Sequence, residues 1–133
     1  MSGVAILRSL IVANAPLIAQ IPAIRIYAGV APVNTVIPAI AITQISGQQH
    51  NTVAMTESPY IFTERVQITV FAKTYPLQKS YLSLIRAALP NQHGTINGFN
   101  TDSILPDIES PDMYDSVALI YMQGYDFIVR YFK

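Results

Sequence analysis

Cysteine is absent from the sequence, and this absence excludes several kinds of chemistry at once. A chain without thiols has no disulfide, no zinc–thiolate site and no cysteine nucleophile. The absence is consistent with a cytosolic product. No other pattern in the sequence predicts a cofactor, and we expect none.

Charged residues are also scarce. They make up 12% of the 133 residues, whereas apolar residues make up 51%. Typical soluble domains carry about 25% charged residues. The length is that of one domain, so residues 1–133 are treated as a single unit with one core. With so little charge, part of the apolar surface is expected to meet other subunits, which favours an oligomer over a poorly soluble monomer.

The formal net charge is zero, so no overall field attracts nucleic acid or an anionic membrane. The charge is nevertheless uneven along the chain. Residues 1–100 carry six cations and two acids, hence +4, whereas residues 101–133 carry two cations and six acids, hence −4. Two interpretations stay open. Either the two parts neutralise each other within one fold, or an acidic edge of one subunit meets a basic edge of the next, as in a head-to-tail ring.

Histidine, the commonest metal ligand, occurs only as His50 and His93. Neither has a second ligand at the i+2, i+3 or i+4 position that would make a metal pair, which favours two exposed loop histidines. A site made by the fold from both histidines and a carboxylate remains open.

Acidic residues cluster between Asp102 and Asp115, but the sequence does not place any two of them across a cleft, as glycosidase chemistry requires. The spacing of Asp112 and Asp115 lacks the glycine and closing glutamate of a calcium loop, which leaves at most a weak cation site. No G-x-S-x-G nucleophile elbow or glycine-rich phosphate loop is present. The sequence therefore indicates a protein that is not an enzyme. A small hydrolase or ligand-binding domain is the alternative from another class.

The apolar stretches do not predict a membrane segment. The stretch from Met1 to Gln20 contains Arg8 but no basic region before it, unlike a signal peptide. Residues 26–56 lack charge but contain prolines, asparagines and glutamines that are costly in hydrocarbon. A lipid-surface helix is a further alternative, although the N-terminal segment has few cations beyond Arg8. We expect no membrane partner.

Apolar spacing predicts helices over residues 2–13 and 75–89, with one further turn over residues 15–20. Thr74 is the expected N-cap of the second helix, and Pro76 lies in its first turn. Strands are predicted over residues 24–27, 36–45, 64–73, 95–108, 116–122 and 124–132. The fourth is broken by Gly98 and Pro106 and is expected to bend, and a bulge at Gly124 would join the last two into one strand. Residues 47–56 are predicted as a long loop or an extended hairpin arm, and residues 109–115 as an acidic loop. Strands that run together beside helices indicate an α+β fold, in which a mainly antiparallel, mixed sheet has two helices packed on one face.

Three segments resemble one known family in their order and spacing. They are residues 38–42 (PAIAI) before a polar segment, residues 64–75 (ERVQITVFAKTY) before a helix ending in IRAAL, and residues 112–115 (DMYD) leading to residues 125–131 (YDFIVRY). In this order they resemble the small tail-completion, or tail-terminator, proteins of long-tailed bacteriophages, which are minor tail proteins that act in head–tail joining. The resemblance covers nearly the whole chain.

The resemblance implies a mixed sheet with helices packed against it and a structural role in the virion. Such proteins form a ring, commonly hexameric, that caps the finished tail tube, stops its polymerisation and offers a surface to the head connector. The implied partners are further copies of the chain, the tail tube protein and a connector or neck protein. No specific nucleic-acid binding is implied, although DNA can pass through the ring. The implied location is the tail or neck of the virion, assembled in the host cytoplasm. Another neck, head-closure or baseplate subunit is the alternative within this class.

The family offers no catalytic residue to transfer to this chain. Because family rings use loops and sheet edges for contacts, the interface is expected in residues 47–57, 64–71 and 107–115 and in the last strand. The charge-poor first sixty residues depart from many relatives, which leaves the chemistry of the interface open. We expect residues 47–57 to become ordered only against a neighbour or the tube. The candidate interface residues are Gln48, Gln49, His50, Arg65, Gln67, Asp107, Asp112, Asp115 and Arg130.

Overall fold

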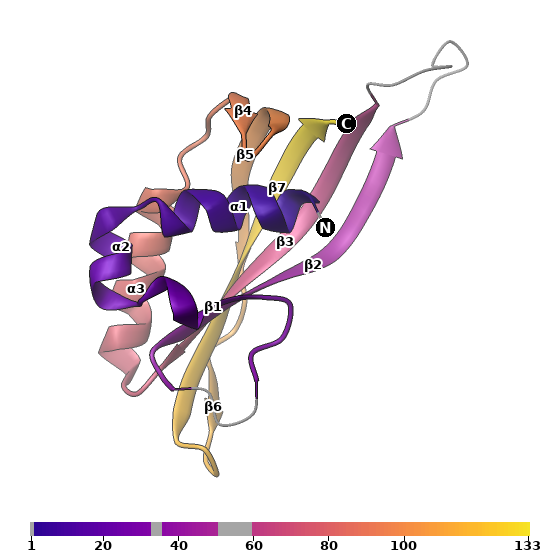
Figure 1. Cartoon of the computed structure of the whole chain (residues 1–133). Coiled ribbons are helices and arrows are strands. Elements are labelled where there is room, and N and C mark those ends of the chain that lie inside the picture. Colours follow the sequence, from indigo (N-terminus) through magenta and orange to yellow (C-terminus); the bar gives the residue numbers. More distant parts are fainter. Residues whose placement is uncertain (1, 33–35, 51–59) are drawn as a thin grey trace.

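A curved sheet covered by helices on one face makes up most of the structure (Figure 1), which is a computed structural model that describes residues 2–32, 36–50 and 60–133. In chain order the elements are α1 (Ser2–Val12), α2 (Ala15–Gln20), the 3₁₀ turn η1 (Ala23–Arg25), β1 (Ile26–Ala28), β2 (Ala39–His50), β3 (Ile61–Ala72), α3 (Tyr75–Ala88), β4 (Gly94–Ile96), β5 (Phe99–Glu109), β6 (Met113–Asp115) and β7 (Ile120–Phe132).

The strands form one mixed sheet in the order β1-β2-β3-β7-β5-β4, and β6 pairs with β7. β1 is parallel to β2, whereas the other described pairs are antiparallel. The two central strands pair along their full length, from Ile61 opposite Phe132 to Ala72 opposite Tyr121. The predicted α+β class, with a mixed and mainly antiparallel sheet, is confirmed.

β3 shows how the sheet separates its two faces. Val66, Ile68 and Val70 are completely buried, whereas the residues between them are half-buried. This alternation with a period of two is the one predicted from the sequence, and it places the apolar side chains toward the helices. Phe127, which pairs with Val66 from the neighbouring β7, is also completely buried and extends the same core.

The helices cover one face of the sheet (Figure 1), and α2 and α3 begin where the sequence provides N-caps. Asn14 caps α2 by accepting a hydrogen bond from the Leu17 N–H at 3.0 Å. Thr74 caps α3 as predicted, with 3.3 Å between its Oγ1 and the Leu77 nitrogen. The turn predicted over residues 15–20 is a short helix, so three α-helices rather than two pack beside the sheet.

Several predicted strand boundaries are wrong. Ile24 lies in the 3₁₀ turn rather than in β1. The strand predicted over residues 95–108 is instead a hairpin of β4 and β5, because Asn97 and Gly98 take positive φ angles of 51° and 81° and reverse the chain. Residues 116–119 form a turn rather than the start of a strand.

The last strand is continuous through Gly124, so the bulge expected there is absent. Gly124 pairs with Thr69 in an unbroken β3–β7 register. The register shifts next to β7 lie instead on β5, between Thr101 and Ser103 and between Pro106 and Glu109. The acidic loop predicted over residues 109–115 shortens to residues 110–112, since β5 reaches Glu109 and β6 follows.

Two hairpins extend beyond the part of the sheet that the helices cover (Figure 1). β2 and β3 pair as far as His50 and Ile61, so residues 47–50 belong to an extended arm, which is one of the two predicted options. The remainder of the predicted loop, residues 51–57, lies outside the described residues. In the part of the chain that the structure describes, no helix is long and apolar enough to cross a membrane.

Candidate subunit interface

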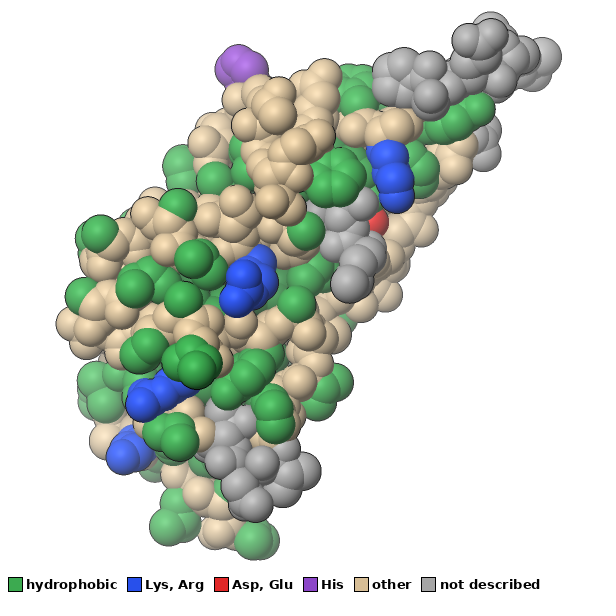
Figure 2. All heavy atoms as spheres, viewed as in Figure 1, with side chains coloured by type: hydrophobic (Ala, Val, Ile, Leu, Met, Phe, Trp, Pro, Cys, Tyr) green, Lys and Arg blue, Asp and Glu red, His purple; other side chains and the backbone are tan. Residues whose placement is uncertain are grey.

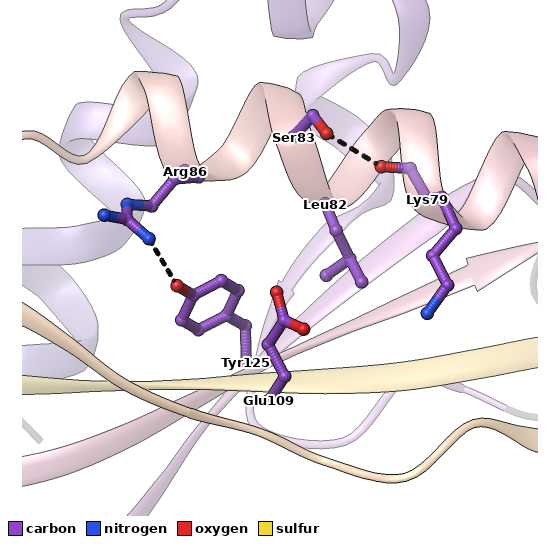
Figure 3. A pocket seen from close by; sticks show the side chains of 6 residues that line it. All are labelled: Lys79, Leu82, Ser83, Arg86, Glu109 and Tyr125. Carbon is purple, nitrogen blue, oxygen red and sulfur yellow. Dashed lines mark hydrogen bonds between the residues drawn. The ribbon is translucent and has the colours of Figure 1, made fainter.

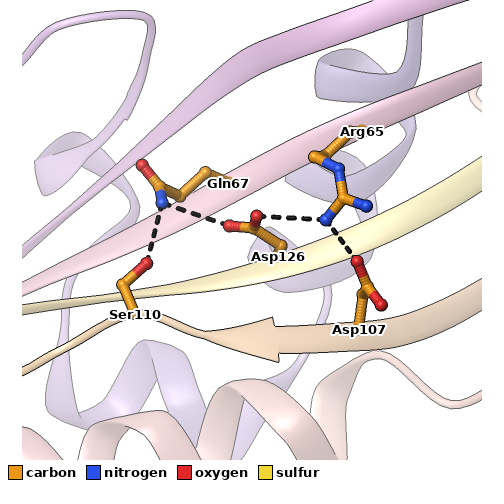
Figure 4. Close-up of polar contacts among 5 residues, drawn as sticks. All are labelled: Arg65, Gln67, Asp107, Ser110 and Asp126. Atoms are coloured by element: carbon orange, nitrogen blue, oxygen red, sulfur yellow. Dashed lines mark hydrogen bonds and ion pairs between the residues drawn. The ribbon is translucent and has the colours of Figure 1, made fainter.

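A network of polar side chains joins β3, β5 and β7 on the sheet face opposite the helices (Figure 4). Arg65 forms ion pairs with Asp107 and with Asp126, the second with 3.2 Å between Nη1 and Oδ2. The Nε2 of Gln67 donates to Asp126 Oδ1 at 3.1 Å and to Ser110 Oγ at 3.0 Å. Three neighbouring strands are therefore fixed to one another through side chains as well as through their backbones.

The electrostatics of this network favour a charged Arg65. The hydrogen bond to Asp107 raises the pKa of the guanidinium above its ordinary value, burial opposes this, and Asp126 raises the pKa further. About a third of each side chain in the Arg65–Asp107 pair is exposed, with values of 31% and 33%. Such a pair contributes little net stability in water, so its main effect is to orient the two side chains on the surface.

His50 and Arg130 meet at a third residue farther along the same face. The His50 Nε2 lies 2.7 Å from Thr63 Oγ1, and Arg130 Nε donates to the same oxygen at 3.5 Å. The expectation that His50 is an isolated loop residue is therefore wrong, since it ends β2 beside β3. His93 is exposed in the segment before β4.

The two acids considered for a weak cation site have separate partners within the protein. Asp112 accepts hydrogen bonds at 2.8 Å from both Lys79 Nζ and Tyr75 OH. The bond from Lys79, and then that from Tyr75, lowers the pKa of Asp112, while Asp112 in turn raises the pKa of Lys79. Asp115 accepts from backbone N–H groups of its own turn. No group of three His, Cys, Asp or Glu side chains suited to a metal ion occurs among the residues that the structure describes.

The nine predicted interface residues thus fall into separate places. Arg65, Gln67 and Asp107 share one network, while His50 and Arg130 meet at Thr63. Gln48 and Gln49 are exposed on the outer arm of β2. Because successive side chains of a strand point to opposite faces of the sheet, these two glutamines lie on different faces. Two further members of the Arg65 network, Asp126 and Ser110, are not among the nine predicted residues. The alternation of the last strand was a signal for Asp126, because it lies between the core residues Tyr125 and Phe127 and therefore faces the other way.

The ion pairs also bear on the uneven charge of the sequence. Arg65 and Lys79, from the basic part of the chain, pair with three acids of the last third, namely Asp107, Asp112 and Asp126. Neutralisation within the fold therefore accounts for part of the asymmetry. The remaining acids of that region, Asp102, Glu109 and Asp115, have no ion pair within the described residues.

A pocket of about 290 Å³ lies between α3 and strands β5 and β7 (Figure 3). Most of its polar side chains form hydrogen bonds with one another or with neighbouring residues. Arg86 donates to the Tyr125 hydroxyl at 2.6 Å, and Lys79 donates to Gln123 at 2.7 Å. The Ser83 hydroxyl donates to the backbone carbonyl of Lys79 at 3.1 Å rather than to a side-chain base. This arrangement does not resemble an activated nucleophile and gives no support to the hydrolase alternative.

Most of the exposed large apolar side chains among the described residues lie in two segments. One is the stretch around η1 and β1 and before β2, and the other is the β6–β7 hairpin with the end of β5. Such exposure is typical of surfaces that meet another protein. The exposed residues in these segments are Ile24, Val30 and Val36 in the first and Ile108, Met113, Tyr114, Val117 and Leu119 in the second.

Comparison with known proteins identifies the fold but no family. No protein-family model matches the chain, and no curated protein matches it in sequence. The structure is similar to a chain of the virion of a native gene transfer agent particle, with a TM-score of 0.69 and 12% sequence identity. The match covers 96% of this chain and 92% of the other. At this identity, the two chains are shown to share their fold.

Gly124 leaves room for the Gln67 side chain across the β3–β7 pair. A Cβ at this position would lie 2.8 Å from Gln67 Nε2 and 3.0 Å from its Cγ. We expect Gly124→Ala to displace Gln67 from Asp126 and Ser110 and to lower the free energy of unfolding by about 2 kcal/mol, as measured by urea denaturation.

A double-mutant cycle isolates this contact from other effects of the alanine. In a Gln67→Ala background, where the crowding atoms are gone, Gly124→Ala should cost at least about 1 kcal/mol less than in the native chain. Equal costs in the two backgrounds would show that the Gln67 side chain does not occupy this space.

Proposed function

We propose that this chain is a structural subunit of a phage-like virion. The proposal is carried by the fold shared with a chain of a gene transfer agent virion, over nearly the full length of both chains. Because one fold can serve many functions, the surface must support the role as well. The exposed apolar side chains of the β6–β7 hairpin and of the segment around β1 provide that support, since they suit a protein that contacts other subunits.

Within the virion, the proposed role is a ring, with six subunits expected, that caps the tail tube and ends its polymerisation. The same ring would offer its other side to the head connector. Three observations support this role: the resemblance of residues 38–42, 64–75, 112–115 and 125–131 to tail terminators, the two extended hairpins, and the short edge strand β1. β1 pairs only with Ile40–Ile42 of β2, and no described strand lies beside the outer edge of β2 farther along the arm.

This role is structural and requires no catalysis. The polar groups of the pocket beside α3 are engaged in hydrogen bonds that do not resemble an activated nucleophile. The polar network on the open sheet face likewise links strands to each other. Both features suit a structural role without catalysis. The proposed location is the tail or neck, and the proposed partners are further copies of the chain, the tail tube protein and a neck or connector protein.

The first test is the native mass of the purified protein over a concentration series, with negative-stain imaging of large species. We expect closed rings with a central hole, and rings at one end of tail tubes when tubes are supplied. Added to a growing tube protein, the chain should stop elongation at amounts far below one copy per tube subunit. A protein that leaves tube growth unchanged, and that labelling places at the head vertex or baseplate, would support the alternative neck or baseplate assignment instead.

A further inference from the structure

The β6–β7 hairpin ends in an apolar turn that faces solvent. Val117 is 92% exposed and Leu119 is 62% exposed. The Oδ1 of Asp115 holds the turn by accepting hydrogen bonds from the N–H groups of Val117 and Ala118 at 3.0 and 3.1 Å. Leu119 has a φ of 59°, a conformation that is unfavourable for a residue with a side chain. A projecting turn that holds two large apolar side chains in water indicates a contact with another surface.

A second surface of the same chain has matching properties. An open pocket of about 380 Å³ lies along α1 and is here named the α1 pocket; its lining residues are Ala5, Arg8, Ser9, Val12, Ala13 and Asn97. Small and aliphatic side chains make up most of this lining, so the pocket has space for aliphatic side chains of another molecule. Arg8 donates through Nε to the Ile26 carbonyl at 3.2 Å. Within the described residues, no group accepts a hydrogen bond from its two terminal nitrogens.

The charges of the two surfaces are complementary. The face of the molecule that carries α1 shows Lys and Arg side chains at several places and acidic side chains at almost none (Figure 2). The turn, in contrast, contains Asp115, which forms no ion pair within the described residues. An acidic, apolar turn and a cationic, apolar pocket attract each other both electrostatically and through burial of apolar area.

The turn does not reach the α1 pocket of its own chain. In Figure 1 the β6–β7 hairpin projects at one end of the molecule, well separated from α1 and from the β4–β5 hairpin that completes the pocket. A contact between them therefore joins two copies. Since the two surfaces differ, the contact is heterologous, and repetition of a heterologous contact closes into a ring or continues as a filament.

We propose that the turn formed by residues 115–119 of one copy inserts into the α1 pocket of a second copy. Val117 and Leu119 lie against the small side chains of α1, and the Asp115 carboxylate lies beside the Arg8 guanidinium. The inference rests on the proposed function, because it names the contact between neighbouring subunits of the ring.

The absence of cysteine allows a direct test with single substitutions. Val117→Cys and Ser9→Cys proteins, mixed under mild oxidation, should form a mixed disulfide, which requires the two Cα atoms to approach within about 7 Å. Ser83→Cys, at an exposed position of α3 outside both surfaces, is the matched control. We expect the disulfide between the Val117→Cys and Ser9→Cys proteins to form roughly tenfold faster than the one with Ser83→Cys. Equal rates, or a preference for Ser83→Cys, would overturn the inference.

A second measurement tests the energy of the contact rather than its geometry. Val117→Asp should weaken self-association, measured by sedimentation over a concentration series, by roughly tenfold or more in Kd. Leu77→Asp, at an exposed apolar residue of α3 that lies outside both surfaces, should leave it unchanged. Both sites are solvent-exposed, so neither substitution is expected to unfold the chain.

The outcomes separate this contact from the proposed function. If the Val117→Asp protein forms rings and caps tubes like the native protein, the contact is wrong while the ring role stands. If the selective disulfide forms but the protein never stops tube growth, the contact stands and the tail-capping role is wrong.

Discussion

Phe127→Ala is expected to lower the free energy of unfolding by roughly 4 kcal/mol. Phe127 lies in the middle of the central strand β7, is completely buried, and stacks on Tyr125 with 4.9 Å between ring centroids. Removing the ring leaves a cavity between the sheet and the helices that the surrounding strands cannot close. Such a loss is a large part of the 5–15 kcal/mol that stabilises a typical domain. Urea denaturation followed by far-ultraviolet circular dichroism measures it, and this signal suits a chain without tryptophan.

Phe132→Ala is the matched control for this substitution. Phe132 lies on the same strand but is half-buried on the other face of the sheet, opposite Ile61. Its removal should cost less than half as much, about 1–2 kcal/mol, because its ring already contacts water. Equal losses from the two substitutions would contradict the assignment of the core to the helix-bearing face.

The elements that could be predicted from the sequence are those with a strong local signal. α3 has a threonine cap, a proline in its first turn and apolar residues at helical spacing, and it was predicted to within one residue of its observed end. β3 alternates between polar and apolar residues over residues 65–70, because one of its faces packs against helices and the other carries Arg65, Gln67 and Thr69. In both cases, local preference and tertiary packing favour the same structure.

The β4–β5 hairpin could also have been predicted, because Asn97-Gly98 is a strong signal for a tight hairpin turn. However, its first strand, β4, has three residues, so the sequence pattern favours one longer strand with a bend at Gly98. The error at residues 116–119 has a different cause. Val117 and Leu119 are the kind of residue that a buried strand contains, and a sequence does not distinguish side chains buried within a chain from those available to a partner.

The polar network could not be predicted as a unit. Arg65, Asp107 and Asp126 are far apart in sequence, and they meet only because β7 inserts between β3 and β5. Sheet register decides such contacts, and a shift of one residue would turn each side chain to the other face. Gly124 illustrates the same limit. A glycine inside a strand predicts a bulge, whereas the absence of a side chain at Gly124 leaves room for the Gln67 side chain on the neighbouring strand.

Glu64→Ala is expected to cost about 3 kcal/mol, because two buried donors would lose their acceptor. Glu64 is only 5% exposed on β3. Its Oε2 accepts a hydrogen bond from the Gly3 N–H at 2.6 Å, and its Oε1 accepts one from the Tyr131 hydroxyl at 2.8 Å. A carboxylate from the sheet thus caps the first turn of α1, where a negative charge also interacts favourably with the helix dipole. Urea denaturation measures the loss, and hydrogen exchange should show weaker protection in α1.

Two variants separate the parts of this interaction. Tyr131→Phe removes one donor and keeps the ring, so we expect a loss of about 1 kcal/mol with α1 protection unchanged. Glu64→Gln keeps an acceptor for one donor but turns an NH₂ group toward the other. Its loss in free energy of unfolding should therefore lie between the losses caused by Glu64→Ala and by Tyr131→Phe. If Glu64→Ala were as mild as Tyr131→Phe, the bond to Gly3 would contribute nothing measurable. The attachment of α1 to the sheet would then depend on the hydrogen bond from Arg8 to the Ile26 carbonyl and on the packing of the buried side chains of the helix, which are Val4, Ile6, Leu7 and Ile11.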